Sequence, residues 1–331
     1  MGAGRAIGVD VGGTKTHLRI ERGSQRLADE VIPTASWWSP GSPIEAPGNA
    51  AALVAACGDT TASAMVVGAH GIDSVRAADA MAAELGRLVD GSVQVLNDAA
   101  LVGPAAGYLG QVITVISGTG SIVLARSARG EEIRLGGHGY LLGDEGSAPA
   151  LVRDLARDLL RGLDRGDHDP VALQALVDAA GLPASVEPEE DLAAALHQHC
   201  SITDWGRIAP AVFSAADAGS LLARGVIARH AAELVALVEL HLARGAEPEA
   251  VVLAGGVVTA QPRIADAIRV GIHAAHPQLP VVLLTRPPVE GAVLLARQSL
   301  NHPESPTSAP PPAETQQPLA QVPAPNEGSR S

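Results

Sequence analysis

The 331-residue chain contains little lysine and little cysteine. Lys15 is its only lysine, so chemistry that needs a lysine amine has one candidate. The two cysteines, Cys57 and Cys200, are far apart, and neither has a second cysteine at metal-site spacing. This argues against a disulfide framework and a zinc ribbon, and we expect both residues to be small buried apolar side chains.

Positive charge and long apolar runs are also scarce. The 23 Lys and Arg against 36 Asp and Glu give a net charge of −13, which repels nucleic-acid phosphates and anionic lipid. No apolar run approaches the roughly 18 residues that span a bilayer. Residues 1–5 lead directly into a strand-like segment without the apolar stretch of a signal peptide. We therefore expect a cytoplasmic protein that binds neither nucleic acid nor membrane.

The length predicts two domains with a cleft. The first half begins with strands at 6–11 and 16–21, separated by a glycine turn, and a third strand at 26–32. The alternating elements that follow predict a parallel continuation of this sheet. They are a helix at 50–56, a strand at 64–68, a helix at 75–89 and a strand at 92–96.

The same plan recurs in the second half. A strand at 112–116 and one at 122–126 flank a glycine-rich turn at 117–121, and a third strand follows at 131–135. Helices dominate to residue 245. The last elements are a strand at 251–253, a helix at 262–275, a strand at 281–284 and a helix at 290–300. We expect domains at 1–108 and 109–289, with helix 290–300 packing back on the first.

The tail over residues 301–331 carries 8 of the 24 prolines and few large apolar residues. It has little apolar surface to bury, so we expect it to be disordered.

Residues 8–16 nearly fit a P-loop, but Thr14 occupies the position of the required lysine and a strand follows instead of a helix. A Rossmann fingerprint does not align either. What remains is a tight turn with exposed backbone N–H groups and the Thr14 hydroxyl, which suits phosphate oxygens. Glycines in a hairpin are often turn chemistry alone. The recurrence at 117–121 and the glycine pair Gly255-Gly256 favour the phosphate interpretation.

These three motifs resemble the two phosphate motifs and the adenosine motif of the actin, Hsp70 and sugar kinase superfamily. The segment 136–147, GGHGYLLGDEGS, resembles the signature of the N-acetylglucosamine kinase and BadF/BadG/BcrA/BcrD ATPase family, most like actinobacterial glucosamine kinases. The likeness spans residues 6–299. It implies an α/β fold of two ribonuclease-H-like domains of the actin/hexokinase/Hsp70 type, whose mixed sheets are flanked by helices and whose cleft closes over ATP and a hexosamine.

The resemblance also implies roles for matched residues. Asp98 becomes the general base that accepts the proton of the sugar 6-hydroxyl, although a helix N-cap is the plain alternative. Asp10 would hold Mg²⁺ through water. The implied ATP and phosphate contacts are Gly12, Gly13, Thr14, Lys15, Gly118, Thr119, Gly120, Gly255 and Gly256. For Lys15 a solvated strand lysine is the alternative.

The implied sugar contacts are Asp73, Asn97, Asp98, Gly137, His138, Asp144 and Glu145. Asp144 would accept a hydroxyl hydrogen bond, or else cap the following helix. Relatives that use N-acetylglucosamine often have Trp where His138 stands and Asn where Ile122 stands, which favours the free amine here. Trp37 and Trp38 are candidates for a pocket wall or for core cover.

The sequence therefore predicts an ATP- and Mg²⁺-dependent glucosamine 6-kinase acting as a homodimer, with N-acetylglucosamine as the alternative substrate. An ATPase activator with an iron–sulfur cluster needs clustered thiolates, which Cys57 and Cys200 do not supply. A sugar-sensing regulator is disfavoured because no DNA-binding segment precedes residue 6. A metal pair at His197 and His199 is also disfavoured, since the two side chains point to different faces of a helix.

Overall fold

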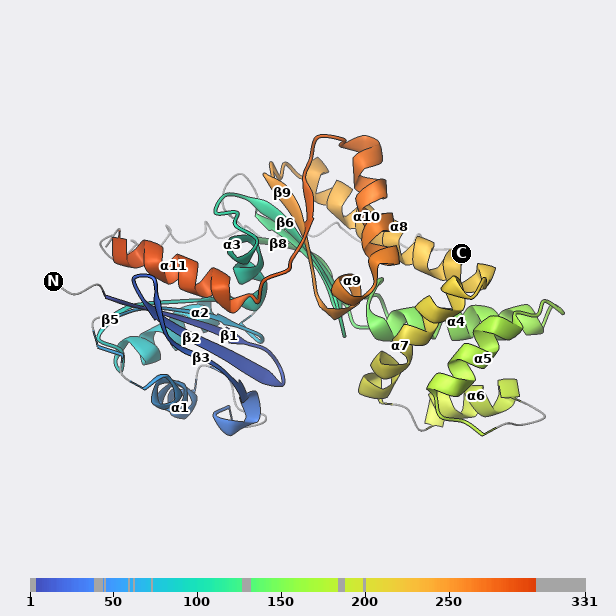
Figure 1. The fold of residues 1–331 in the computed structure, drawn as a ribbon, viewed down its shortest axis with the longest axis horizontal. Helices are drawn as coiled ribbons and strands as arrows, with labels where there is room; N and C mark the ends of the chain where they lie inside the picture. Colours follow the sequence, from blue (N-terminus) through green and yellow to red (C-terminus); the bar gives the residue numbers. More distant parts are fainter. Residues whose placement is uncertain are drawn as a thin grey trace, which may run out of the picture.

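The computed structural model describes residues 4–38, 44, 46–58, 60–61, 63–72, 74–126, 132–183, 188–198 and 201–301. Within them the chain forms two five-stranded mixed sheets flanked by helices, arranged side by side as two lobes (Figure 1). The predicted site residue Asp73, the residues His199 and Cys200, and residues 302–331 of the proline-rich tail lie outside the described part; Asn301, which was expected to be disordered, is the last residue of a helix. None of the helices in these ranges is long and apolar enough to span a membrane.

The first sheet has the strand order β3-β2-β1-β4-β5. Strand β1 pairs antiparallel with β2 and parallel with β4, as the sequence predicts. The apolar and β-branched residues of β1 are almost completely buried, which suits a central strand. The strands are β1 (Arg5–Val11), β2 (Lys15–Arg22), β3 (Gln25–Pro33), β4 (Ser63–Ala69) and β5 (Gly91–Asn97).

Four short helical elements accompany this sheet: the 3-10 helix η1 (Thr34–Ser36), α1 (Pro47–Cys57), α2 (Val75–Gly86) and the 3-10 helix η2 (Asp98–Leu101). Ser74 caps α2 by accepting a hydrogen bond from the Ala77 N–H. The helix predicted at 75–89 is three residues too long, because the backbone turns after Gly86 and Val89 packs into the core instead.

The second sheet has the order β10-β9-β6-β7-β8. Each of its strands corresponds to one strand of the first sheet, in the same order. Strand β6 pairs antiparallel with β7 and parallel with β9, just as β1 does with β2 and β4. The strands are β6 (Val112–Ser117), β7 (Ser121–Arg126), β8 (Glu132–Gly136), β9 (Ala250–Ala254) and β10 (Val281–Leu283). The duplication predicted from the glycine turns is confirmed in the topology.

The second half differs by a long helical insertion between β8 and β9, which lies at the end of the molecule away from the first sheet (Figure 1). Its core is continuous with that of the second sheet. The insertion contains α4 (Ala148–Leu163), α5 (Pro170–Ala179), α6 (Pro188–Gln198), α7 (Ile202–Asp217) and α8 (Leu221–Ala243), and α9 (Gly256–Ala260) and α10 (Pro262–Ala275) follow β9.

Two helices connect the halves. Helix α3 (Val102–Ala105) leads out of the first sheet, and Val102 packs against β9 of the second. Helix α11 (Val289–Asn301) returns and lies along the first sheet (Figure 1), where Ala292, Val293 and Ala296 pack with β1 and β4. Gly8 makes this possible, since a Cβ there would lie 2.6 Å from a Val293 methyl carbon.

Candidate active site

A cavity of about 1100 Å³ lies between the two halves, at the carboxyl ends of parallel strands from both sheets. This is the edge where open α/β sheets bind ligands. Eleven of the predicted site residues line it: Gly13, Thr14, Asn97, Asp98, Gly118, Thr119, Gly120, Gly137, Asp144, Gly255 and Gly256. Segments more than 200 residues apart in the sequence thus meet at one place.

The first glycine turn, residues 12–15, joins β1 to β2. Its Gly12 N–H donates to the Lys15 carbonyl at 2.9 Å, which leaves Gly13 and Thr14 exposed to the cavity. Thr34 supports the turn from outside: its N–H donates to the Thr14 carbonyl at 3.0 Å and its Oγ1 to the Gly12 carbonyl at 2.8 Å. Gly12 and Lys15 do not belong to the cavity lining within the described residues.

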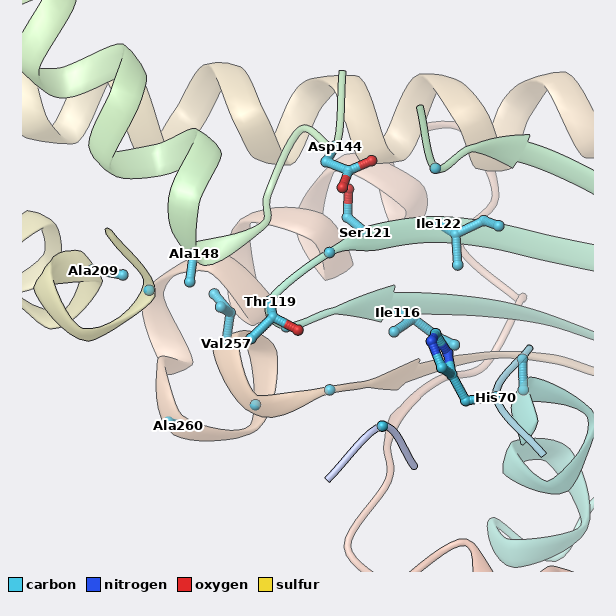
Figure 2. A pocket seen from close by; sticks show the side chains of 18 of the residues that line it. His70, Ile116, Thr119, Ser121, Ile122, Asp144, Ala148, Ala209, Val257 and Ala260 are labelled. Atoms are coloured by element: carbon cyan, nitrogen blue, oxygen red, sulfur yellow. The ribbon is translucent and has the colours of Figure 1, made fainter. Parts of the chain in front are cut away.

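The second glycine turn, residues 117–121, joins β6 to β7 and is supported by a different segment. The hydroxyl of Ser117 donates to the Gly146 carbonyl and that of Ser121 to the Glu145 carbonyl, each at 2.7 Å. The Gly118 carbonyl accepts the N–H of Ala148, the first residue of α4. Figure 2 shows Thr119 in the cavity near Val257 and Ala148. Both ends of this turn are therefore tied to residues 144–148.

Gly255 brings the third motif against the second turn. Its φ is +101°, a conformation that favours glycine, and a Cβ there would overlap the carbonyl oxygen of Ser117. The same approach places Gly256 beside Gly118. Only glycine fits this contact, so the second turn and the Gly255-Gly256 pair form one continuous backbone surface.

Asp98 follows β5 directly and is the first residue of η2. Its Oδ1 accepts the Ala99 N–H at 2.9 Å, and Asn97 Oδ1 accepts the same N–H at 3.1 Å. Asn97 is the N-cap of η2, and its Nδ2 donates to the Ile72 carbonyl at 3.0 Å. The cap position therefore belongs to Asn97, and the Asp98 carboxylate faces the cavity.

Asp10 lies behind this surface on β1 and does not line the cavity within the described residues. Burial, together with the nearby charge of Asp98, raises the pKa of the Asp10 carboxyl to about 7. The charge of Asp98 contributes to this shift after burial, so negative charge is concentrated here, which favours a hard divalent cation. No group of three or more His, Cys, Asp or Glu side chains suited to a metal occurs in the described part of the chain. Mg²⁺ fits, because it is commonly held by one or two carboxylates plus substrate phosphates and water.

The signature loop, residues 136–147, forms another wall. Asp144 is buried with a φ of +55°, and its Oδ1 accepts the Gly139 N–H at 3.0 Å. Its other oxygen lies beside Gly120, and Figure 2 shows the carboxylate next to Ser121. The following helix is capped by Ser147, not by Asp144. Of the remaining predicted sugar contacts, His138 and Glu145 are not part of the cavity lining among the described residues.

Other lining residues belong to no glycine motif. Four of them are His70, Ile116, Ile122 and Arg134. Helix α7 contributes Thr203, Gly206, Arg207, Pro210 and Phe213, and Gln261 follows α9 directly. Helix α7 contains a glycine and a proline that both face the cavity, and these two residues, unfavourable inside a helix, were the available signal in the sequence. Trp37 is only 6% exposed and donates from Nε1 to Thr16 Oγ1, so it is core and supports the first turn.

The two repeated sheets and the glycine turns across the cleft define a protein of the actin-like class, the fold of two-domain sugar kinases. A solved structure from Chromobacterium violaceum, described as an N-acetylglucosamine kinase candidate, superposes with a TM-score of 0.63 at 23% identity, covering 89% of this chain and 99% of that one. The chain belongs to the BadF/BadG/BcrA/BcrD ATPase family, whose model matches residues 7–296.

Two relatives match nearly end to end. The N-acetylmuramic acid/N-acetylglucosamine kinase of Clostridium acetobutylicum is 26% identical over 310 residues, which cover 88% of this chain and 97% of the relative. The N-acetyl-D-glucosamine kinase of Dictyostelium discoideum is 25% identical over 315 residues, covering 88% and 98%.

Proposed function

We propose that this protein is an ATP-dependent hexosamine kinase that transfers the γ-phosphoryl group of ATP to the sugar 6-hydroxyl. The observation that carries this proposal is the meeting of two glycine turns, the Gly255-Gly256 pair and the Asp98 carboxylate around one cavity. Phosphoryl transfer depends mainly on positioning and charge stabilisation, which such a backbone surface supplies. The family and the two named relatives support the same chemistry.

Each part of the cavity has a role in this reaction. The N–H groups of the two turns and the hydroxyls of Thr14 and Thr119 hold phosphate oxygens. Asp98 accepts the proton of the attacking hydroxyl. Asp10 would hold Mg²⁺ through water; when bound, the ion neutralises charge on the phosphates of ATP. The adenine base and the ribose of ATP are placed between α7 and α9, against Phe213 and Gln261.

N-acetylglucosamine is the first substrate to test, because both relatives carry that sugar in their names. Free glucosamine is the second candidate. At neutral pH its amine is largely a cation, which the cavity carboxylates Asp98 and Asp144 would attract. Ile122, also in the cavity wall, offers the acetamide no hydrogen-bond partner, and Trp37 is buried in the core.

A coupled assay of ADP release with ATP and Mg²⁺, run over N-acetylglucosamine, glucosamine, mannosamine and glucose, tests the proposal. We expect the two glucosamine sugars to exceed glucose in kcat/KM by tenfold or more, about 1.4 kcal/mol. Their ratio decides between acetamide and free amine. Release of ADP that is independent of sugar would contradict a kinase and favour an ATPase. Light scattering on the same protein tests the predicted homodimer.

A further inference from the structure

A buried polar pair connects the helices α4 and α8 behind the signature loop. His230 on α8 is 1% exposed and Asp154 on α4 is 5% exposed. His230 Nε2 lies 3.0 Å from Asp154 Oδ2. Burying two polar side chains is costly unless their hydrogen bonds are satisfied, so the partners of this pair indicate what it does.

The partners lead to both ends of one stretch of the loop. His230 Nδ1 accepts the N–H of Gly146 at 2.7 Å. Since Nδ1 is the acceptor, Nε2 carries the proton and donates to Asp154. The second oxygen of Asp154 accepts from Arg153 Nε at 2.7 Å, and Arg153 Nη1 donates to the carbonyl of Tyr140. Asp154 is thereby linked to residue 140 through Arg153 and to residue 146 through His230.

The surroundings of Asp154 favour its ionised carboxylate. Burial alone would raise the pKa of the Asp154 carboxyl, but the hydrogen bonds from His230 and Arg153 hold it well below its usual range. Arg157 adds a contact at 3.3 Å to the same carboxylate. Glu145, Glu233 and Arg229 are the other charged groups around this pair.

Gly146 is closely packed at this end of the loop. Gly146 has a φ of +85° and lies against Leu234 of α8, where a Cβ would overlap the leucine side chain. The adjacent carbonyls accept the hydroxyls of Ser117 and Ser121 on the second glycine turn. A fixed Gly146 amide therefore fixes the segment that carries Asp144 and that supports this turn.

We propose that His230 and Asp154 are positioning residues that hold residues 140–146 in the geometry that binds the sugar; this rests on the proposed function. Neither side chain lines the cavity within the described residues, so both act through the loop. Asp144 is the group they place, because it lies between the two anchored ends and faces the cavity.

The test compares three variants with the wild type in the assay above, using the sugar that gives the higher kcat/KM. His230→Leu removes both hydrogen bonds. His230→Gln retains an amide oxygen for the Gly146 N–H and an N–H for Asp154. Arg229→Ala is the matched control, since it breaks the neighbouring bond between α8 and α4, Arg229 to Asp158 at 2.6 Å, and Arg229 makes no hydrogen bond to the loop in the described part of the chain.

We expect His230→Leu to raise the KM for the sugar about tenfold or more and the KM for ATP by a clearly smaller factor, because the second turn, which the loop supports, is only one of the two turns that hold phosphate. His230→Gln should restore the sugar KM to within about threefold of wild type, and Arg229→Ala should leave it unchanged. A folded His230→Leu protein with a wild-type sugar KM would overturn the proposal. Should this variant fail to fold, Asp154→Asn replaces it, with a smaller rise expected and an unchanged KM overturning the proposal equally.

Amide hydrogen exchange of residues 139–147 provides a readout that does not need activity. Protection of the Gly146 amide should fall in His230→Leu and persist in Arg229→Ala. Equal protection in both variants would overturn the positioning role. If the wild type phosphorylates no sugar, the proposed function fails, whereas the exchange experiment still decides whether His230 holds the loop.

Discussion

The two halves share a strand plan but contribute differently to the cavity. Aligning Thr14 with Thr119 places Val115 of β6 opposite Asp10 of β1, so the carboxylate of the first half corresponds to an apolar residue in the second. Asp98 follows β5, whereas β10 is followed by uncharged Leu284 and Thr285. The repeat thus supplies two similar glycine turns, whereas the strand-end carboxylates Asp10 and Asp98 have no acidic counterparts at the matching positions of the second half.

The halves also differ in how their turns are supported. Thr34, which holds the first turn, belongs to a short segment within the same half and has no role in the signature loop. The second turn is held by the signature loop through Ser117 and Ser121. We infer that the second turn responds to whatever moves the sugar-binding loop, while the first does not.

The largest effect on activity should come from Asp98, the carboxylate that the first half contributes to the cavity. Asp98→Asn keeps the side-chain volume but cannot accept the proton, so we expect kcat to fall by about 10² to 10⁴. Binding of ATP, measured by titration calorimetry, should stay within about threefold. A variant with more than half of the wild-type kcat would show that Asp98 serves only the turn after β5.

The contact between motifs in the second half should come next. Gly255→Ala introduces a Cβ that overlaps Ser117 and strains a positive φ, so we expect a loss of about 2 to 4 kcal/mol in unfolding free energy and weaker ATP binding. Gly245→Ala is the control, because Gly245 has a φ of +85° with open space around it. Equal losses in urea unfolding of the two variants would mean that the close approach is unimportant.

The partly buried acid Asp10 of the first half should show in the pH dependence of stability. The pKa of Asp10 is about 7 in the folded protein and near 4 when unfolded, so the native state holds the extra proton and stability falls as the pH rises from about 4 to 7. We therefore expect Asp10→Asn to melt several degrees higher than metal-free wild type at pH 8, with a smaller difference at pH 5.

Activity of Asp10→Asn should nevertheless fall at least about tenfold, and added Mg²⁺ should raise the wild-type Tm more than that of the variant. The exposed acid Asp90 is the control, and Asp90→Asn should match wild type at both pH values. A melting difference between Asp10→Asn and wild type that does not change with pH would contradict the raised pKa.

The smallest effect should come from the support of the first turn. Thr34→Val removes the hydroxyl that donates to the Gly12 carbonyl but keeps the backbone bond to Thr14, so we expect the KM for ATP to rise about two- to fivefold and the sugar KM to remain unchanged. Ser36→Ala on the same 3-10 helix touches no turn residue and serves as control. A parallel rise in the sugar KM would contradict the independence of the first turn.

Much of the fold could be predicted because local signals agreed. Two apolar strands around a glycine turn, once at residues 6–21 and again at 112–126, indicated the duplicated plan, which the topology confirms. The ends of helices were harder to predict from the sequence. Residues 75–89 have the pattern of one continuous helix, but the helix ends at Gly86 and Val89 packs into the core.

The site was predictable where a backbone requirement leaves a residue signature, as at Gly255. It was not predictable where ordinary residues acquire a role through tertiary position. Phe213 lines the cavity because the helical insertion packs beside it. His230 accepts a hydrogen bond from Gly146, a residue 84 positions earlier in the chain. The resemblance placed His138 and Glu145 at the sugar, and that placement stays a prediction.

Helix α11 has a consequence for synthesis on the ribosome. The face of the first sheet that carries Ala6, Ala64 and Val66 is covered by residues near position 293, which are among the last described residues to be made. At about 5 to 20 residues per second, some 15 to 60 seconds pass between the emergence of β1 and that of its cover. During that interval the nascent first half presents an apolar sheet face, so its final folding waits until residues 289–301 have been translated.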